Sequence, residues 1–210
     1  MTPLMTDAGV IPCFQNLTPF ILASASPRRR EMLTDLGLQF RVEDAEADER
    51  VQAGESPEAF VLRVAKDKAM IVGYKYPGVW VLAADTVVVL GGEILGKPTD
   101  AKDATLMLQR LAGRWHEVWT GFWLGRTGDE HHIHRAVKTD VQFADLSGPM
   151  IRAYVRTGDP LDKAGGYGIQ SLAAFMVQGI RGSYSNVVGL PLTEVVAAMA
   201  ALGLIQPAAT

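Results

Sequence analysis

The sequence predicts an α/β fold with an α+β-like mixed β-sheet. Helical segments with recognisable start and stop signals alternate with apolar strand segments along the 210 residues, and hairpin turns separate several of the strands. Hydrophobic residues make up 48% of the chain and charged residues 20%, which is ordinary for a globular protein. A chain of this length can bury one substantial core or form two lobes that share a sheet.

Composition and charge limit the classes of function. The formal net charge of −3 argues against binding to a nucleic acid polymer, which usually needs a basic surface. Cys13 is the only cysteine, so an intramolecular disulfide and a thiolate metal cluster are excluded. No run of eighteen apolar residues predicts a membrane span, and residues 1–17 do not resemble a signal peptide. We expect a cytoplasmic protein with an N-terminal extension over residues 1–17 and a single domain over residues 18–210.

The first strand and helix enclose an unusual cluster of arginines. Residues 20–23 have the composition of a buried strand, and a helix is predicted over residues 27–36, with Ser26 as its cap and Pro27 in its first position. Arg28, Arg29 and Arg30 then lie at the positive end of the helix dipole, where cations are disfavoured. Either the helix start is simply solvated or an anion binds there, because backbone N–H groups and guanidinium groups converge on it.

The later elements follow from similar signals. Ser56 is predicted to cap a helix that continues to about residue 72, and Gly91 and Gly92 turn a buried strand over residues 79–90 into a hairpin. Helices are also predicted within residues 99–113, 147–158 and 190–203, and paired strands within residues 116–124 and 132–143.

Two charged residues interrupt apolar patterns. Asp85 lies inside the buried strand, so its carboxylate must be paired, protonated or bound to a metal, unless it caps a neighbouring loop. Thr86 points to the opposite face of a regular strand and fits a core position by pattern alone. Lys68 continues the helical stripe of Phe60 and Val64, which places its ammonium either at the surface or in a cleft.

Two other motifs are incomplete. Residues 91–97 match the spacing of a phosphate-binding P-loop, but Pro98 stands where a hydroxyl for Mg²⁺ is needed. Lys97 is still placed to contact a phosphate from the end of a hairpin. His132 and His134 share a strand face within residues 131–134. A polar strand end explains them better than a metal site does, because no cysteine or third histidine is available on that face to complete a site, although a carboxylate could.

Five segments together resemble the Maf family of nucleoside triphosphate pyrophosphatases. They occur in the order and spacing of the family and extend the resemblance over residues 20–204. The segments are ASASPRRREML, ADTVV, GKP, DPLDKAGGYGIQ and GSYSNVVGLPL. The stretch DKAGGYGIQ is more similar to the subgroup that acts on dTTP and UTP than to relatives that act on 7-methyl-GTP.

The resemblance implies a reaction and an architecture. The reaction is hydrolysis between the α- and β-phosphates, which yields a nucleoside monophosphate and pyrophosphate with the help of a divalent cation, Mg²⁺ or Mn²⁺. The implied fold has two lobes with a central cleft, is related to inosine-triphosphate pyrophosphatases and often forms a homodimer. The expected partner is a nucleoside triphosphate, with no membrane and no nucleic acid polymer.

The resemblance also assigns roles to residues at matching positions. Asp85 is the implied proton acceptor. Residues at the specificity positions of the family are Arg28, Thr86 and Gln170. Polar positions lining the cleft are Ser24, Arg29, Glu49, Lys68 and Lys97. The chemistry of these side chains agrees: cations face a triphosphate, and the carboxylates of Glu49 and Asp85 are oxygen ligands that Mg²⁺ or Mn²⁺ prefers. Gln170 offers a donor and an acceptor to uracil or thymine.

Two other functions are compatible with the same residues. A pyrophosphatase could prefer 7-methyl-GTP or modified pyrimidine nucleotides, and a nucleotide-binding regulator of cell division would bind triphosphates without turnover. A regulator needs the arginines but not a pair of carboxylates that activate water. The presence of both Glu49 and Asp85 therefore favours the enzyme.

Overall fold

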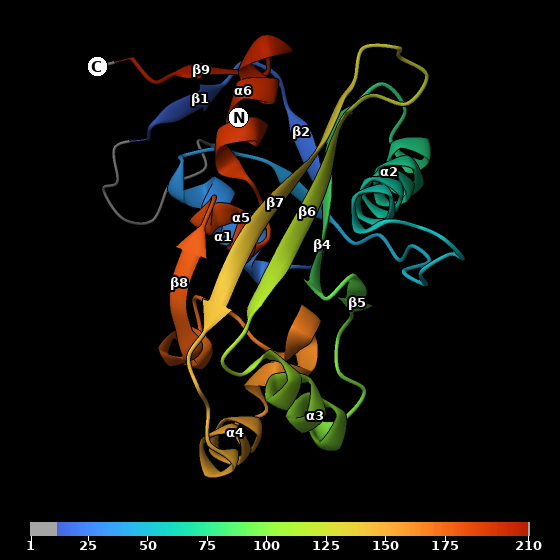
Figure 1. Cartoon of the computed structure of the whole chain (residues 1–210). Coiled ribbons are helices and arrows are strands. Elements are labelled where there is room, and N and C mark those ends of the chain that lie inside the picture. Colours follow the sequence, from blue (N-terminus) through green and yellow to red (C-terminus); the bar gives the residue numbers. More distant parts are fainter. Residues whose placement is uncertain (1–11, 210) are drawn as a thin grey trace.

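The computed structural model describes residues 12–209, and within them a mixed β-sheet has helices on both faces (Figure 1). The strand order in its main sheet is β3-β2-β4-β6-β7-β8, and β5 also pairs with β4. Strand β2 runs parallel to β3 and to β4, whereas the other pairs are antiparallel. The strands are β2 (Phe20–Ala23), β3 (Arg41–Glu43), β4 (Trp80–Leu90), β5 (Glu93–Leu95), β6 (Trp115–Gly125), β7 (Ile133–Phe143) and β8 (Val177–Arg181). The predicted α/β fold with a mixed sheet is confirmed.

The α-helices match the predicted segments except for the one at residues 184–188, which was not predicted. The α-helices are α1 (Pro27–Asp35), α2 (Pro57–Lys75), α3 (Ala101–Leu111), α4 (Gly148–Val155), α5 (Tyr184–Val188) and α6 (Leu192–Ala201). Short 3₁₀ helices are η1 (Asp159–Asp162), η2 (Ala164–Gly166) and η3 (Leu172–Met176). Ser56 caps α2 as predicted, because its Oγ accepts a hydrogen bond from the backbone N–H of Ala59 at 3.2 Å.

The predicted side-chain cap of α1 is wrong. Ser26 occupies the N-cap position, but its side chain makes no capping hydrogen bond. Its backbone N–H instead donates to Oγ of Ser24 at 3.2 Å, which turns the chain sharply between β2 and α1. The first turn of α1 therefore keeps N–H groups that no side-chain cap satisfies, which is the usual condition of an anion-binding helix start.

The two faces of β4 pack against different helices. Odd-numbered residues such as Val81 and Val87 pack with Val64 and Ala65 of α2. Even-numbered residues face the other way, where residues of α1 and α6 pack near one end of β4 and residues of α3 and α4 near the other. Figure 1 shows α2 on one side of the sheet and α1, α5 and α6 on the other. Because both faces are covered, β4 is almost continuously apolar, and a polar residue within it needs a specific partner.

One edge of β4 is left unpaired over four residues. Strand β2 pairs with β4 up to Ala23 and Ala83, and β5 begins to pair at Val88 and Leu95. Both neighbours lie on the same edge, because β6 pairs along the other edge throughout. Residues 84–87 therefore border a gap through which both faces of the sheet can be reached.

The segment before the main sheet also has a defined partner. Strand β1 (Phe14–Asn16) pairs antiparallel with β9 (Ile205–Pro207). The predicted N-terminal extension thus contributes a strand over its last residues, while its residues 1–11 lie outside the described part. Among residues 12–209, no helix has both the length and the apolar character that crossing a membrane requires.

A buried histidine lies near the start of β6. His116 on β6 is 3% exposed, and its Nε2 is 2.7 Å from the hydroxyl of Tyr167. Burial lowers the pKa of His116 from 6.5 to about 4, because the charged imidazolium would lose its hydration. Between these two values the unfolded chain binds a proton that the folded chain does not.

We expect the free energy of unfolding to fall as the pH is lowered from about 6.5 towards 4. The lowered pKa of His116 accounts for a loss on the order of 3 kcal/mol over this window. In the variant His116→Gln, which keeps a hydrogen-bonding partner for Tyr167 but does not titrate, this decrease should be smaller. Urea unfolding at pH 7 and pH 4.5 measures the difference, and equal pH dependence in both proteins would contradict the assignment.

Candidate active site

A cavity of about 550 Å³ opens at the unpaired edge of β4. Its wall includes the turn after β2, the segment before α2, the residues after β5 and the Gly-rich segment around η2. All nine predicted site residues line it: Ser24, Arg28, Arg29, Glu49, Lys68, Asp85, Thr86, Lys97 and Gln170. Side chains separated by up to 146 positions in the sequence are therefore brought to one hollow, and its wall carries both signs of charge.

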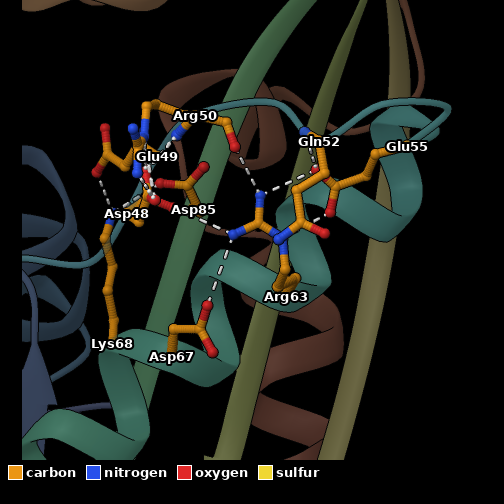
Figure 2. Close-up of polar contacts among 9 residues, drawn as sticks. All are labelled: Asp48, Glu49, Arg50, Gln52, Glu55, Arg63, Asp67, Lys68 and Asp85. Atoms are coloured by element: carbon orange, nitrogen blue, oxygen red, sulfur yellow. Dashed lines mark hydrogen bonds and ion pairs between the residues drawn. The ribbon is translucent and has the colours of Figure 1, made fainter.

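On the α2 face of β4, one ammonium lies between two carboxylates (Figure 2). Nζ of Lys68 is 2.7 Å from Oδ1 of Asp85 and 2.6 Å from Oε1 of Glu49. The side chains of Lys68 and Asp85 are each 10% exposed, whereas that of Glu49 is 45% exposed. The alternative in which Lys68 extends to the surface is wrong, because α2 packs flat on β4 and directs this position into the cavity.

The two carboxylates have opposite pKa shifts. Burial raises the pKa of Asp85 above its ordinary value, and the neighbouring charges of Lys68 and Arg29 only partly oppose this. Burial is also the largest single influence on Glu49, but Lys68, Lys97 and Arg29 together outweigh it and lower the pKa of Glu49. The half-exposed carboxylate therefore has the lower pKa of the two, and the buried one is the stronger base.

On the opposite face of β4, Arg29 links three parts of the chain. Its Nε donates to the backbone oxygen of Gly189 at 2.7 Å, Nη1 donates to Oγ of Ser24 at 3.1 Å, and Nη2 donates to Oγ1 of Thr86 at 2.9 Å. Oγ1 of Thr86 also lies 2.9 Å from Oγ1 of Thr120. Thr86 does point away from the Asp85 face, as the strand geometry predicts, and it belongs to this hydrogen-bonded group rather than to an apolar core.

The remaining cations are more accessible. Arg28 is half-buried, and Nη1 is 3.7 Å from a carboxylate oxygen of Asp162. Lys97 is exposed and follows β5 directly, which confirms that residues 91–97 form a hairpin and not a P-loop. Arg30 is exposed and does not line the cavity. Arg28 and Lys97 therefore line the cavity and make few polar contacts with other described residues.

Sequence reasoning missed the residues that shape the wall near Gln170. Lys163 is 7% exposed, and its Nζ donates to the backbone oxygen of Asp159 and to Oδ1 of Asp162, both at 2.6 Å. Oγ of Ser171 donates to Oδ2 of Asp159 at 2.6 Å. These bonds fix both ends of the segment that carries Gln170. The spacing of Asp159 and Lys163, four residues apart in a Gly-rich stretch, is the signal that could have indicated the pair.

The histidines of residues 131–134 lie at the far end of the β6–β7 hairpin. The rings of His132 and His134 stack with centroids 5.5 Å apart, and His132 also stacks on Trp123 at 5.6 Å. They belong to an aromatic stack on the strands and do not line the cavity.

The fold and the cavity define an α/β protein whose cavity wall carries arginine and lysine side chains beside two carboxylates. The model of the Maf-like protein family matches residues 19–202, and the chain belongs to this family. The family resemblance seen in the motifs is thereby confirmed.

Curated relatives with a stated activity are similar over most of the chain. The dTTP/UTP pyrophosphatase of Myxococcus xanthus is 51% identical over 190 residues, which cover 90% of this chain and 95% of that protein. The dTTP/UTP pyrophosphatase of Desulfotalea psychrophila is 52% identical over 178 residues, 85% of this chain and 91% of that protein. Among solved structures, the Staphylococcus aureus Ham1 protein is 13% identical with a TM-score of 0.38 over 61% of this chain and 73% of that chain, a similarity too slight to define the fold.

Removing the central ammonium should expose the repulsion between the carboxylates. We expect Lys68→Met to lower the free energy of unfolding at pH 7 by about 3 kcal/mol, because it leaves the buried charge of Asp85 without its closest partner. The double variant Lys68→Met with Asp85→Asn should recover part of this loss. Urea unfolding of the two single variants and the double variant measures the coupling; strictly additive effects would argue against a direct interaction.

Proposed function

We propose that this protein hydrolyses dTTP and UTP to the nucleoside monophosphate and pyrophosphate. The observation that carries the proposal is the convergence of Asp85, Glu49 and Lys68 in a cavity that Arg28 and Lys97 also line. The relatives named dTTP/UTP pyrophosphatase support the substrate class, since they are about half identical over most of the chain.

The cations of the cavity would bind the triphosphate. Arg28 and Lys97 face the hollow, and the first turn of α1 offers backbone N–H groups beside Arg28. Their positive charge would be fixed before substrate arrives, so it would stabilise the charge that develops on the phosphoryl oxygens and on the leaving pyrophosphate.

Asp85 would act as the proton acceptor for the attacking water. Oδ1 already accepts from Lys68, while Oδ2 has no hydrogen-bonding partner among the described residues. Water attacks the α-phosphorus, and its proton passes to the carboxylate. The bond between the α-phosphorus and the bridging oxygen breaks, and its electron pair leaves with pyrophosphate. The raised pKa of Asp85 suits this role, because a carboxylate with a higher pKa is a stronger base.

The residues present fit a divalent cation such as Mg²⁺ or Mn²⁺. Oxygens of Glu49 and Asp85 converge so closely that one ammonium contacts both, and hard oxygen ligands are what these metals prefer. Within the described residues, no further carboxylate, histidine or cysteine is grouped with these two carboxylates as a possible metal ligand. Water and phosphate oxygens would therefore complete the ligand set. Bound there, the cation would supply positive charge to the phosphates and lower the pKa of water.

Residues on the opposite face of β4 would recognise the nucleobase. Gln170 is exposed in the cavity wall, and its amide provides the donor and the acceptor that match O4 and N3–H of a pyrimidine. Thr86 and Arg28 are the other proposed specificity positions. A homodimer stays a prediction from the family resemblance, and a cytoplasmic location stays a prediction from the sequence pattern.

Loss of the proton acceptor should abolish turnover without unfolding the protein. We expect Asp85→Asn to reduce kcat on UTP by at least about a hundredfold, the range typical of removing a general base. Asp140→Asn, on β7 and outside the cavity, should keep wild-type activity. Pyrophosphate release in the presence of Mg²⁺ measures both variants, with thermal unfolding as the check on folding. Near-normal turnover by Asp85→Asn would refute its role, and an inactive wild type would favour a regulator that only binds nucleotides.

Removal of the Gln170 amide should weaken base selection. In Gln170→Ala, we expect kcat/KM for UTP and dTTP to fall about tenfold, the value of one or two hydrogen bonds, with little change for a purine triphosphate. A panel of triphosphates that includes 7-methyl-GTP measures the preference of both proteins. An unchanged ranking would assign selectivity to other residues, and a wild-type preference for 7-methyl-GTP would replace the proposed substrate.

A further inference from the structure

We propose that Arg63 of α2 is a positioning residue that holds Glu49 in place for cation binding. Figure 2 shows its guanidinium beneath the segment that carries Glu49. Nη1 donates to the backbone oxygen of Asp48 at 3.1 Å, and Nη2 donates to the backbone oxygen of Arg50 at 3.0 Å. One side chain therefore bonds to the residues immediately before and after Glu49. The inference depends on the proposed function, in which Glu49 is a ligand of the divalent cation.

The segment around Glu49 has little other support. Residues 44–50 form neither helix nor strand, and they make no backbone-to-backbone hydrogen bond with any described residue. The carboxylate of Glu49 is about half exposed, and Lys68 is its ion-pair partner. A divalent cation placed between Glu49 and Asp85 would compete with Lys68 for the same oxygens. The backbone contacts of Arg63 are independent of that competition, so they would keep Glu49 in place when Lys68 is displaced.

Arg63 is itself held rigidly. Its Nε donates to Oε1 of Glu55 at 2.6 Å, and its Nη2 donates to Oε2 of Glu55 at 2.9 Å. The carboxylate of Glu55 is 8% exposed, and its Oε2 also accepts from the backbone N–H of Gln52 at 3.0 Å. Nη1 of Arg63 lies 3.6 Å from Oδ2 of Asp67 on the same helix. The guanidinium fork is thus oriented by two carboxylates and has its remaining donors directed at the carbonyl oxygens beside Glu49.

The contact pattern requires an arginine. Three nitrogens of one planar group bond to Glu55 and to two separate backbone oxygens. A lysine would keep the charge beside Glu55, but its single ammonium cannot reproduce this spread of donors. Arg63→Lys is therefore a variant that preserves the ion pair, and with it the fold, while removing contacts to the Glu49 segment.

The chain also offers a matched control. Arg50 is adjacent to Glu49 in sequence, but its guanidinium bonds only to the carboxylate of Asp48, and its side chain is 90% exposed. Arg50→Ala removes a positive charge next to Glu49 in the sequence, but it keeps the backbone oxygens to which Arg63 donates. A purely electrostatic effect on cation binding would appear in both variants, whereas a positioning effect would appear only at Arg63.

The test measures Mn²⁺ binding without nucleotide. Titrating wild type, Arg63→Ala, Arg63→Lys and Arg50→Ala with Mn²⁺, and following the free ion by its paramagnetic resonance signal, gives the dissociation constants. Removing residues that orient metal ligands typically weakens binding by about 10–100-fold. We expect this loss in both Arg63 variants and a change of less than about twofold in Arg50→Ala. Thermal unfolding shows which variants are folded. If Arg63→Ala is unfolded, the comparison of Arg63→Lys with wild type decides the test.

A second readout separates positioning from damage to the site. The Mn²⁺ concentration for half-maximal UTP hydrolysis should rise in the Arg63 variants, while kcat at saturating Mn²⁺ and KM for UTP stay near wild-type values. Unchanged Mn²⁺ affinity in Arg63→Lys and Arg63→Ala would overturn the inference, as would an equal loss in Arg50→Ala or a wild type that binds no Mn²⁺ without nucleotide. A wild type that binds Mn²⁺ but does not hydrolyse UTP would instead contradict the proposed function and leave the Mn²⁺ comparison valid.

Discussion

The contact of Lys68 with Asp85 and Glu49 is the interaction on which the site depends. A carboxylate in the middle of a strand covered on both faces loses its hydration, and Asp85 persists there because α2 presents an ammonium 2.7 Å away. The same ammonium brings in Glu49 from a segment without regular structure. The charge cluster thereby joins the segment of Glu49 to a helix and a strand that apolar residues already pack together.

The fold was predictable from the sequence wherever the signal was local. Ser56 and Pro57 mark the start of α2, and the apolar run with Gly91 and Gly92 marks β4 and its hairpin. The unpaired stretch of β4 was not predictable, because it depends on where two other strands stop along β4. Ser26 shows the limit of a local rule as well: its position is that of a cap, but Ser24 forms the hydrogen bond that turns the chain.

The site was predictable to the extent that its residues lie in recognisable motifs. Asp85 and Lys68 also stand out by physics alone, since each interrupts an apolar pattern. Arg63 carries no such signal, because its most important partners include backbone oxygens, which a sequence does not distinguish. Lys163 lies within the motif DPLDKAGGYGIQ at a suggestive spacing from Asp159, but its bond to a backbone oxygen is likewise visible only in the structure. Arg29 matches a cleft position, but only the structure shows that its guanidinium is engaged by Ser24, Thr86 and Gly189.

The unpaired edge of β4 has a consequence for how such a protein diversifies. Asp85 and Thr86 are consecutive, yet they serve opposite faces of the strand, with the charged cluster on one face and the segment of Gln170 bordering the other. Under the proposed function, a mutation that remodels the Gln170 side of the cavity would therefore leave the residues that activate water unchanged. Substrate preference would then change in small steps that each retain turnover, because a short unpaired edge of β4 separates the two functions by strand face.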